Sequence, residues 1–302
     1  MKYLFSILTT TILSVNFSFA TDYYLYYLGG QSNMDGYGYT KDLPDTLNKI
    51  YKDVMIFHGN TMPDDTIVDG RGIWAPLQYG HGVGFKSDGK TNKYSDRFGL
   101  ELSFANQLLK SKPNAKIAII KYSRGGTAID VAAQDNYGCW DPDYKGTNGI
   151  NQYDHFLATV RNALSIKDID GDGTPDRLIP SGILWMQGES DGYDDKQVAE
   201  RYLSNLKRLM DIMRAAFLTD DLPVVIGLIS DSGQDKDGKF WNYGTTIQEA
   251  QRYFVKIDAN AALVNSTLNY SYSDAAHYDS KGYIDLGLKF AEAVLLLKQV
   301  NK

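Results

Sequence analysis

The feature that most constrains the fold is a regular alternation of short apolar runs with longer amphipathic segments. Continuous apolar runs suited to buried strands span residues 23–29, 54–57, 116–123, 179–187 and 222–230, and a weaker run spans 261–265. Such runs are typical of parallel strands covered on both faces. Apolar residues at helical spacing lie between them, at 97–112, 152–166, 195–217, 246–256 and 280–299. This order predicts a three-layer α/β/α sandwich around a mostly parallel sheet of five to six strands.

The first twenty residues, MKYLFSILTTTILSVNFSFA, have the pattern of a signal peptide. Lys2 supplies the charged start, an apolar stretch follows, and Ser18 and Ala20 are the small residues expected before a cleavage site. A buried helix or a membrane anchor is the alternative, but the stretch is short for a full span. We therefore expect residues 1–20 to be removed, the protein to be secreted or periplasmic, and residues 21–302 to form one domain.

The charge of the chain limits its partners. Cleavage after Ala20 would remove one basic residue, Lys2, and change the formal net charge from −6 to −7. A negative protein is poorly suited to nucleic acid or to anionic membranes, so we expect neither as a partner.

Cys139 is the only cysteine of the chain, so no intramolecular disulfide can form. Its neighbours Gly138 and Trp140 offer no base that could activate a thiol. We expect Cys139 to be a small buried side chain rather than a nucleophile.

Ser32 follows the first predicted strand, in LYYLGGQSNMDG, and ligands of parallel α/β sheets bind at the carboxyl ends of strands. A serine needs a base to become a nucleophile. His277 has Asp274 three residues before it, close enough to hold Nδ1 and leave Nε2 free. Met34 replaces the second glycine of a G-x-S-x-G elbow, which disfavours that class of hydrolase. Alone, these could be an ordinary turn serine, a helix-start aspartate and a surface histidine.

A third polar stretch, SGILWMQGESDG, ends the fourth predicted strand with Gln187 and Glu189. A side-chain amide at a strand end can donate a hydrogen bond to a developing oxyanion. Taken by itself, the stretch could equally be a polar turn.

Together, GQSNM (30–34), WMQGESD (185–191) and DAAH (274–277) resemble the carbohydrate O-acetylesterases of the SGNH hydrolase superfamily. Sialate O-acetylesterases and family 6 acetylxylan esterases are the most similar groups. Further blocks at 98–108, 117–130 and 277–293 fit the same pattern, although Leu100 stands where proline is usual. The resemblance covers about residues 22–295 and implies the flavodoxin-like SGNH hydrolase fold.

The resemblance also implies roles for individual residues. Ser32 matches the nucleophile, His277 the base and Asp274 the carboxylate that orients the base. The N–H groups of Ser32 and Gly99 and the side chain of Gln187 match the oxyanion hole. Further residues expected to shape or support the pocket are Gln31, Asn33, Arg124, Gly125 and Glu189. The implied reaction removes acetyl groups from a carbohydrate, such as xylan or O-acetyl sialic acid, and needs no cofactor.

Two other functions remain open from the sequence. One is a non-catalytic carbohydrate-binding protein on the same fold, and the other is a lipid or thioester hydrolase of the same superfamily. Tryptophans in polar loops, at 74, 140 and 241, suit the faces of sugars better than acyl chains. We expect the loops at 58–95, 130–150 and 230–245 to determine the substrate.

The segment DIDGDGTPD (168–176) has the spacing of a calcium-binding loop. Aspartates at 168, 170, 172 and 176 fall at positions 1, 3, 5 and 9, and Gly173 falls at position 6. Ile179 occupies position 12, so the usual bidentate acid is missing. The segment is either a structural Ca²⁺ site or a solvated turn that joins a helix to the fourth strand.

Overall fold

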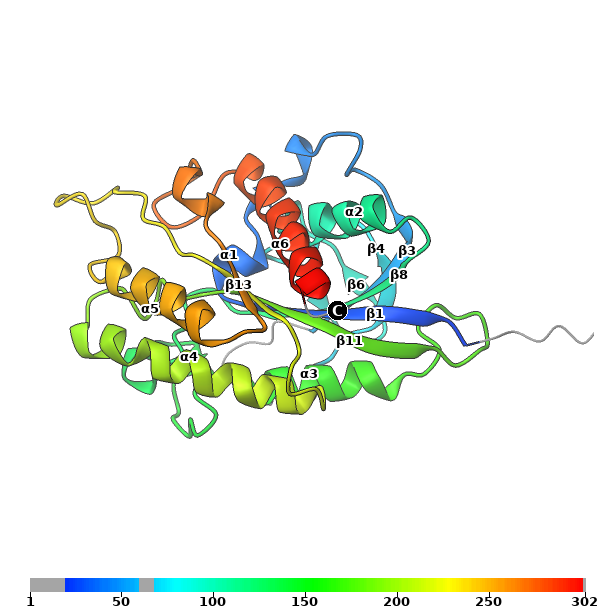
Figure 1. Ribbon diagram of the computed structural model, residues 1–302, viewed down its shortest axis with the longest axis horizontal. Coiled ribbons are helices and arrows are strands. Elements are labelled where there is room, and N and C mark those ends of the chain that lie inside the picture. The colour runs from blue at the N-terminus through cyan, green and yellow to red at the C-terminus, as the bar shows by residue number, and fades with distance from the viewer. Residues whose placement is uncertain (1–19, 60–67, 301–302) are drawn as a thin grey trace, which may run out of the picture.

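A computed structural model describes residues 20–59 and 68–300 of the chain (Figure 1). The predicted signal peptide, residues 1–20, lies outside the described residues except for Ala20. No helix in the described part of the chain is long and apolar enough to cross a membrane.

The central sheet has seven strands among the described residues, in the order β13-β12-β11-β1-β8-β3-β4. Their bounds are β1 Asp22–Gly30, β3 Tyr51–His58, β4 Trp74–Leu77, β8 Lys116–Ser123, β11 Arg177–Met186, β12 Val224–Gly227 and β13 Ala261–Val264. All neighbours pair in parallel except β3 and β4, which are antiparallel. The predicted mostly parallel sheet is confirmed, with one strand more than expected. The extra strand is β4, whose four residues include Pro76 and lie at an edge, where an apolar run is not required.

Helices cover both faces of the sheet, which confirms the three-layer sandwich. Helices α2 (Glu101–Ser111) and α6 (Ser280–Val300) lie over one face, and α3 (Gln152–Ser165) and α4 (Lys196–Ala216) lie over the other (Figure 1). Helix α5 (Gly244–Ile257) packs beside α4. Each of these helices overlaps one of the predicted amphipathic segments.

Shorter elements occupy the connections. They are α1 (Ser32–Asp35), the short strands β2 (Gly38–Tyr39), β5 (Lys86–Ser87), β6 (Asn92–Lys93), β7 (Arg97–Phe98), β9 (Gly138–Cys139) and β10 (Ile150–Asn151), and the 3-10 turns η1 (Thr40–Asp42), η2 (Val131–Ala133) and η3 (Ser266–Asn269).

The core lies between the sheet and its helices. Leu28, Ile119 and Leu184 on the three central strands are fully buried, as continuous apolar runs predict. Cys139 is buried and unpaired, and burial raises the pKa of its thiol to about 12. A thiol with such a pKa is a poor nucleophile, which agrees with the structural role expected for it.

Candidate active site

The nucleophile candidate sits on a sharp turn at the carboxyl end of β1. Ser32 is the first residue of α1, directly after Gly30 and Gln31. Gly30 has φ +144°, and an added Cβ would lie only 1.9 Å from the Met186 carbonyl oxygen, so no larger residue fits. The N–H of Ser32 lies in the first turn of a helix, where no intrahelical acceptor exists. Both the hydroxyl and the N–H of Ser32 are therefore held at the rim of the sheet.

The predicted acid–base pair is formed in the loop before α6. His277 Nδ1 lies 2.8 Å from Asp274 Oδ2, and Asp274 Oδ1 accepts hydrogen bonds from the N–H groups of Ala276 and His277. Burial raises the pKa of Asp274, but the bonds from His277 and from these N–H groups outweigh it and hold the pKa below its usual value. The carboxylate is thus fixed on Nδ1 and leaves Nε2 free.

An aromatic ring supports the imidazole, although no sequence motif indicated it. Tyr37 stacks face to face on His277, with ring centroids 3.5 Å apart and an interplanar angle of 5°. With Asp274 bonded at one edge, the plane of the imidazole is restrained by two contacts.

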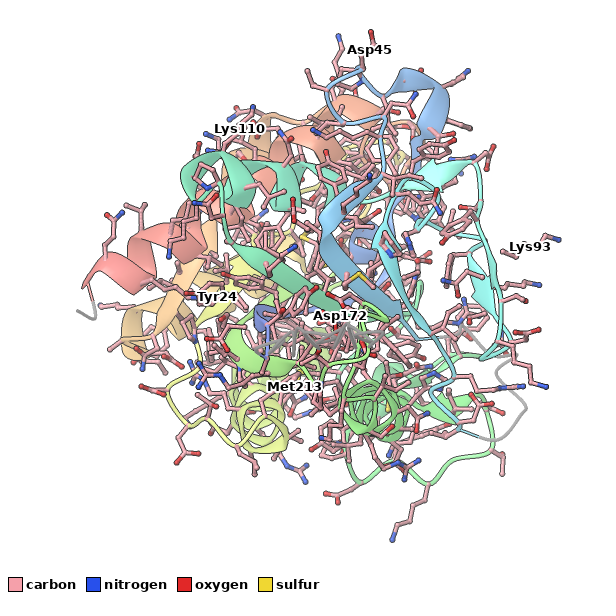
Figure 2. All side chains as sticks on the ribbon, turned by 90° about the vertical axis from the view of Figure 1, so that its right-hand side faces the viewer. Tyr24, Asp45, Lys93, Lys110, Asp172 and Met213 are labelled. Atoms are coloured by element: carbon pink, nitrogen blue, oxygen red, sulfur yellow. The ribbon has the colours of Figure 1, made fainter. Side chains whose placement is uncertain are left out.

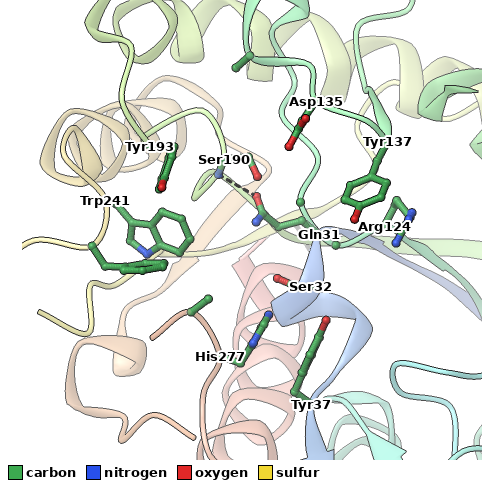
Figure 3. A pocket seen from close by; sticks show the side chains of 15 residues that line it. Gln31, Ser32, Tyr37, Arg124, Asp135, Tyr137, Ser190, Tyr193, Trp241 and His277 are labelled. Atoms are coloured by element: carbon green, nitrogen blue, oxygen red, sulfur yellow. Dashed lines mark hydrogen bonds between the residues drawn. The ribbon is translucent and has the colours of Figure 1, made fainter. Parts of the chain in front are cut away.

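Ser32 and His277 line one cavity of about 410 Å³ at the rim of the sheet (Figure 3). The described structure shows no direct hydrogen bond between their side chains. Serine–histidine bonds of this kind are often long until substrate binds. The cavity also contains Gln31, Arg124 and Gly125, three of the residues expected around the pocket.

Asn33 connects the nucleophile segment to the base loop. Its Nδ2 donates to Glu189 Oε1 at 2.8 Å and to the Ala276 carbonyl at 3.1 Å, and its Oδ1 accepts from the Tyr283 hydroxyl at 2.8 Å. Glu189 is fully buried, and burial raises its pKa to about 7 despite the bond from Asn33. The contact agrees with the interpretation that Glu189 helps to fix the Ser32 segment.

Two predicted oxyanion donors are bonded elsewhere. The Gly99 N–H donates to Glu101 Oε1 at 3.0 Å, and Glu101 is itself paired with the buried Lys121. The Gln187 amide donates to the Thr127 carbonyl and to Asp191 Oδ2. Neither Gly99 nor Gln187 lines the cavity. Buried acceptors beside both residues already use these hydrogens, so the geometry lends no support to the predicted roles of Gly99 and Gln187, which stay predictions.

Two other donors lie beside Ser32. Gly125 follows β8, the strand next to β1, and a Cβ added there would lie 3.3 Å from Ser32 Cβ. Gln31 Oε1 accepts from the N–H groups of Gly188 and Ser190, each at 3.3 Å. These bonds fix the oxygen of the Gln31 amide, and the described structure shows no acceptor for Nε2. The sequence pattern contained Gln31, but its orientation depends on β11 lying beside β1.

The walls of the cavity come from only some of the loops expected to form them. Residues of 130–150 and 230–245 line it, together with Ser190 and Tyr193 from a loop that the prediction omitted, whereas no described residue of 58–95 does. Among the three tryptophans considered, only Trp241 lies there. Trp74 donates to the Ala163 carbonyl at the sheet edge, and Trp140 is buried in the core.

The aspartate loop lies at the opposite end of the sheet, where β11 begins; Asp172 marks it in Figure 2. Asp168, Asp170 and Asp176 each offer an oxygen within 4.8 Å of the others. Asp172 is not part of this group and instead accepts the N–H of Thr174. Three of the four predicted ligands therefore converge in this structure, and Ca²⁺ binding by the loop stays a prediction.

Comparison with known families decides the assignment. A family model described as carbohydrate esterase, sialic acid-specific acetylesterase, matches residues 22–296. The chain belongs to this family. This confirms the resemblance drawn from the sequence motifs, and it makes the protein a carboxylic ester hydrolase.

Solved structures share the fold of this acetylesterase-family chain. A protein from Arabidopsis thaliana has a TM-score of 0.63 at 22% identity, with 92% of this chain and 98% of that chain covered. NanS has a TM-score of 0.60 at 18% identity, covering 93% and 99%. XAC1771, a carbohydrate acetylesterase from Xanthomonas citri, has a TM-score of 0.60 at 16% identity, covering 90% of this chain and 56% of that chain. No curated protein is significantly similar in sequence.

Proposed function

We propose that this protein is a serine esterase that removes O-acetyl groups from carbohydrates, with Ser32 as nucleophile, His277 as base and Asp274 as the orienting carboxylate. The observation that carries the proposal is the 2.8 Å bond between Asp274 and His277 in a cavity that also contains Ser32. Membership of an acetylesterase family supports the same reaction.

In the proposed reaction, His277 Nε2 takes the proton of the Ser32 hydroxyl as Oγ attacks the acetyl carbonyl carbon. The resulting imidazolium is stabilised by Asp274, which is already bonded to Nδ1. When the tetrahedral intermediate collapses, the carbon–oxygen bond to the sugar breaks and His277 protonates the departing sugar oxygen. Water, deprotonated by His277, then attacks the acetyl-serine and releases acetate and the free hydroxyl of Ser32.

For the oxyanion we propose three donors: the N–H groups of Ser32 and Gly125 and the Nε2 of Gln31. Ser32 lies in a first helical turn, Gly125 lies against Ser32, and Gln31 has its oxygen held by Gly188 and Ser190. Fixed donors of this kind stabilise the negative charge without having to reorient during the reaction.

The proposed substrates are O-acetyl sialic acid and acetylated xylan, and the proposed location is the periplasm or the medium. The family description supports the first substrate, and the pattern of residues 1–20 supports export. Mass spectrometry of the protein purified from its native host tests export, because cleavage predicts a mature chain that starts at Thr21.

The decisive experiment measures acetate release from 4-nitrophenyl acetate, acetylated xylan and O-acetyl sialic acid. We expect the wild type to cleave at least one of the sugar esters, and Ser32→Ala to be inactive on all three. Ser204→Ala, at an exposed position of α4, is the matched control and should retain full activity. A wild type as inert as Ser32→Ala would refute the esterase, and a preference for long acyl esters would instead support a lipid hydrolase.

A second experiment compares the two glutamines. Gln31→Ala should lower kcat by about 10²–10³-fold, because it removes one donor to the oxyanion. It should also lower the melting temperature, because Gln31 is buried and accepts the N–H groups of Gly188 and Ser190. Gln187→Ala should chiefly lower the melting temperature, since Gln187 is buried and bonded to Thr127 and Asp191. The reverse result, with kcat lost in Gln187→Ala and kept in Gln31→Ala, would restore Gln187 as the donor.

A further inference from the structure

The cavity is larger than the acetyl group that the proposed reaction cleaves. An acetyl group has only three heavy atoms, so most of the 410 Å³ is available to the alcohol part of the ester. Figure 3 shows two walls beside Ser32: Tyr193 and Trp241 lie on one side, and Tyr137 and Arg124 lie on the other. The alcohol part must therefore fit between an aromatic wall and a wall that carries a guanidinium group.

Tyr193 is the exposed member of the aromatic wall. Its side chain is 52% exposed, whereas Trp241 is 9% exposed. Its ring contacts Phe240 and Trp241 edge-on, with centroids 6.4 and 6.0 Å away, and Phe240 and Trp241 contact each other at 4.6 Å. An exposed aromatic ring that lines the cavity and contacts two further rings is suited to stacking against a flat apolar surface.

The backbone beneath this wall is fixed by two sets of hydrogen bonds. The Asn242 N–H donates to the Tyr193 carbonyl at 3.0 Å, and the Tyr243 N–H donates to the Gly192 carbonyl at 2.9 Å. The Asp231 carboxylate accepts the N–H groups of Phe240 at 2.9 Å and Trp241 at 2.8 Å. The loops after β11 and β12 are thus joined to each other beside Ser32, so the backbone that carries Tyr193 is held in place.

We propose that Tyr193 is the stacking platform for the pyranose ring that carries the acetyl group, and that it is a specificity-determining residue. The C–H groups on one face of a pyranose form a flat apolar patch, and the hydroxyls at the rim of the ring need polar partners. Tyr193 offers the face, and Asp135 and Arg124 on the facing side of the cavity offer partners for hydroxyls. An extended acyl chain would leave those charged groups against hydrocarbon, which is unfavourable.

This inference rests on the proposed esterase function, and two measurements keep the outcomes separate. The first compares KM for O-acetyl sialic acid and acetylated xylan with KM for ethyl acetate, whose alcohol part has no ring. For the sugar ester that the wild type cleaves, Tyr193→Ala should raise KM by about tenfold. For ethyl acetate, it should change KM by less than twofold. Tyr193→Phe keeps the ring and should stay near the wild type. Tyr253→Ala removes a tyrosine of similar exposure (49%) on α5, outside the cavity, and is the matched control.

The second measurement is calorimetric titration of N-acetylneuraminic acid and xylobiose into the Ser32→Ala protein, with and without Tyr193→Ala. Weaker binding of at least one of these sugars in the double variant supports the platform even if the esterase activity fails. Equal changes in KM for sugar and ethyl acetate, or sugar binding that Tyr193→Ala leaves unaltered, would overturn the inference. A selective loss on long-chain acyl esters would overturn it too, since the wall would then bind the acyl side.

Discussion

Acidic residues flank both ends of strand β11, and the two groups differ in burial and in their partners. Before its amino end, the carboxylate of Asp168 is partly exposed and accepts N–H groups of its own turn, from Gly171 and Gly173. At its carboxyl end, Glu189 and Asp191 are fully buried, and burial raises their pKa values to about 7 and about 6. Their partners are distant in sequence: Asn33 for Glu189, and Ile129 for Asp191.

The difference shows what a local pattern can and cannot predict. The turn at 168–176 is built from its own residues, so the spacing of its aspartates and glycines indicates its shape. The burial and bonding of the carboxylates after β11 depend on residues more than sixty positions away in the chain, and no local pattern contains that information. Substitutions at the two ends should therefore differ greatly in their effects.

The largest expected effect is that of Asp191→Ala. Asp191 accepts hydrogen bonds from the Ile129 and Asp130 N–H groups and from the Gln187 amide, and all three donors are buried. An unsatisfied buried donor costs about 1–3 kcal/mol, so the free energy of unfolding should fall by at least about 3 kcal/mol in a urea titration. Asp191→Asn keeps one acceptor oxygen, so its free energy of unfolding should fall by less. A variant with alanine that is as stable as the wild type would contradict this account.

An intermediate effect is expected from Glu189→Gln, seen in the pH dependence of stability. Glu189 has a folded pKa of about 7 against an ordinary value of 4.5. Between these two values the unfolded chain has lost the proton and the folded chain has kept it, so stability falls as pH rises. The loss should reach on the order of 3 kcal/mol above pH 7, because one pKa unit corresponds to about 1.4 kcal/mol.

Glutamine cannot ionise, so the unfolding free energy of Glu189→Gln should decline less steeply than that of the wild type between pH 4.5 and 7. Urea titrations of both proteins across this range measure the difference. Parallel curves for the two proteins would show that Glu189 is already ionised in the folded state.

The smallest effect concerns the exposed loop and calcium. With a dissociation constant of about 0.1 mM, 1 mM Ca²⁺ would stabilise the fold by only about 1.4 kcal/mol. We expect calorimetry to detect this binding, Asp168→Asn to weaken it, and Asp172→Asn to change it little, since Asp172 lies outside the converging group. If no heat of binding appears and a chelator leaves the melting temperature unchanged, the segment is a solvated turn.

Much of the fold could be predicted because its strands are continuous apolar runs. β1, β8 and β11 were expected from residues 23–29, 116–123 and 179–187, and each is paired in the centre of the sheet. β4 was missed because it has only four residues, contains Pro76 and has three residues that are partly or fully exposed. The long helices were predictable for the related reason that each presents one apolar stripe to the sheet.

Less of the site could be predicted, because most of its contacts join residues that are far apart in the sequence. The pair of Asp274 and His277 lies within one turn of chain, so its contact follows from spacing. Gly99 was assigned from the family resemblance of its sequence block, and the pairing of Glu101, which accepts its N–H, with Lys121 depends on two distant elements. Tyr37 beneath His277 and Gln31 beside Ser190 are likewise products of tertiary contact, so no spacing in the sequence indicates them.

The position of Asn33 has a consequence for the order in which the protein matures. Asn33 belongs to the second element of the chain, yet it is held by Ala276 and Tyr283, which flank the start of the last helix. During synthesis, a chain completed only through α5 contains Ser32 but lacks both His277 and the anchors of Asn33. The proposed nucleophile and base therefore meet only when α6 docks, so the proposed reaction requires the whole domain to have folded.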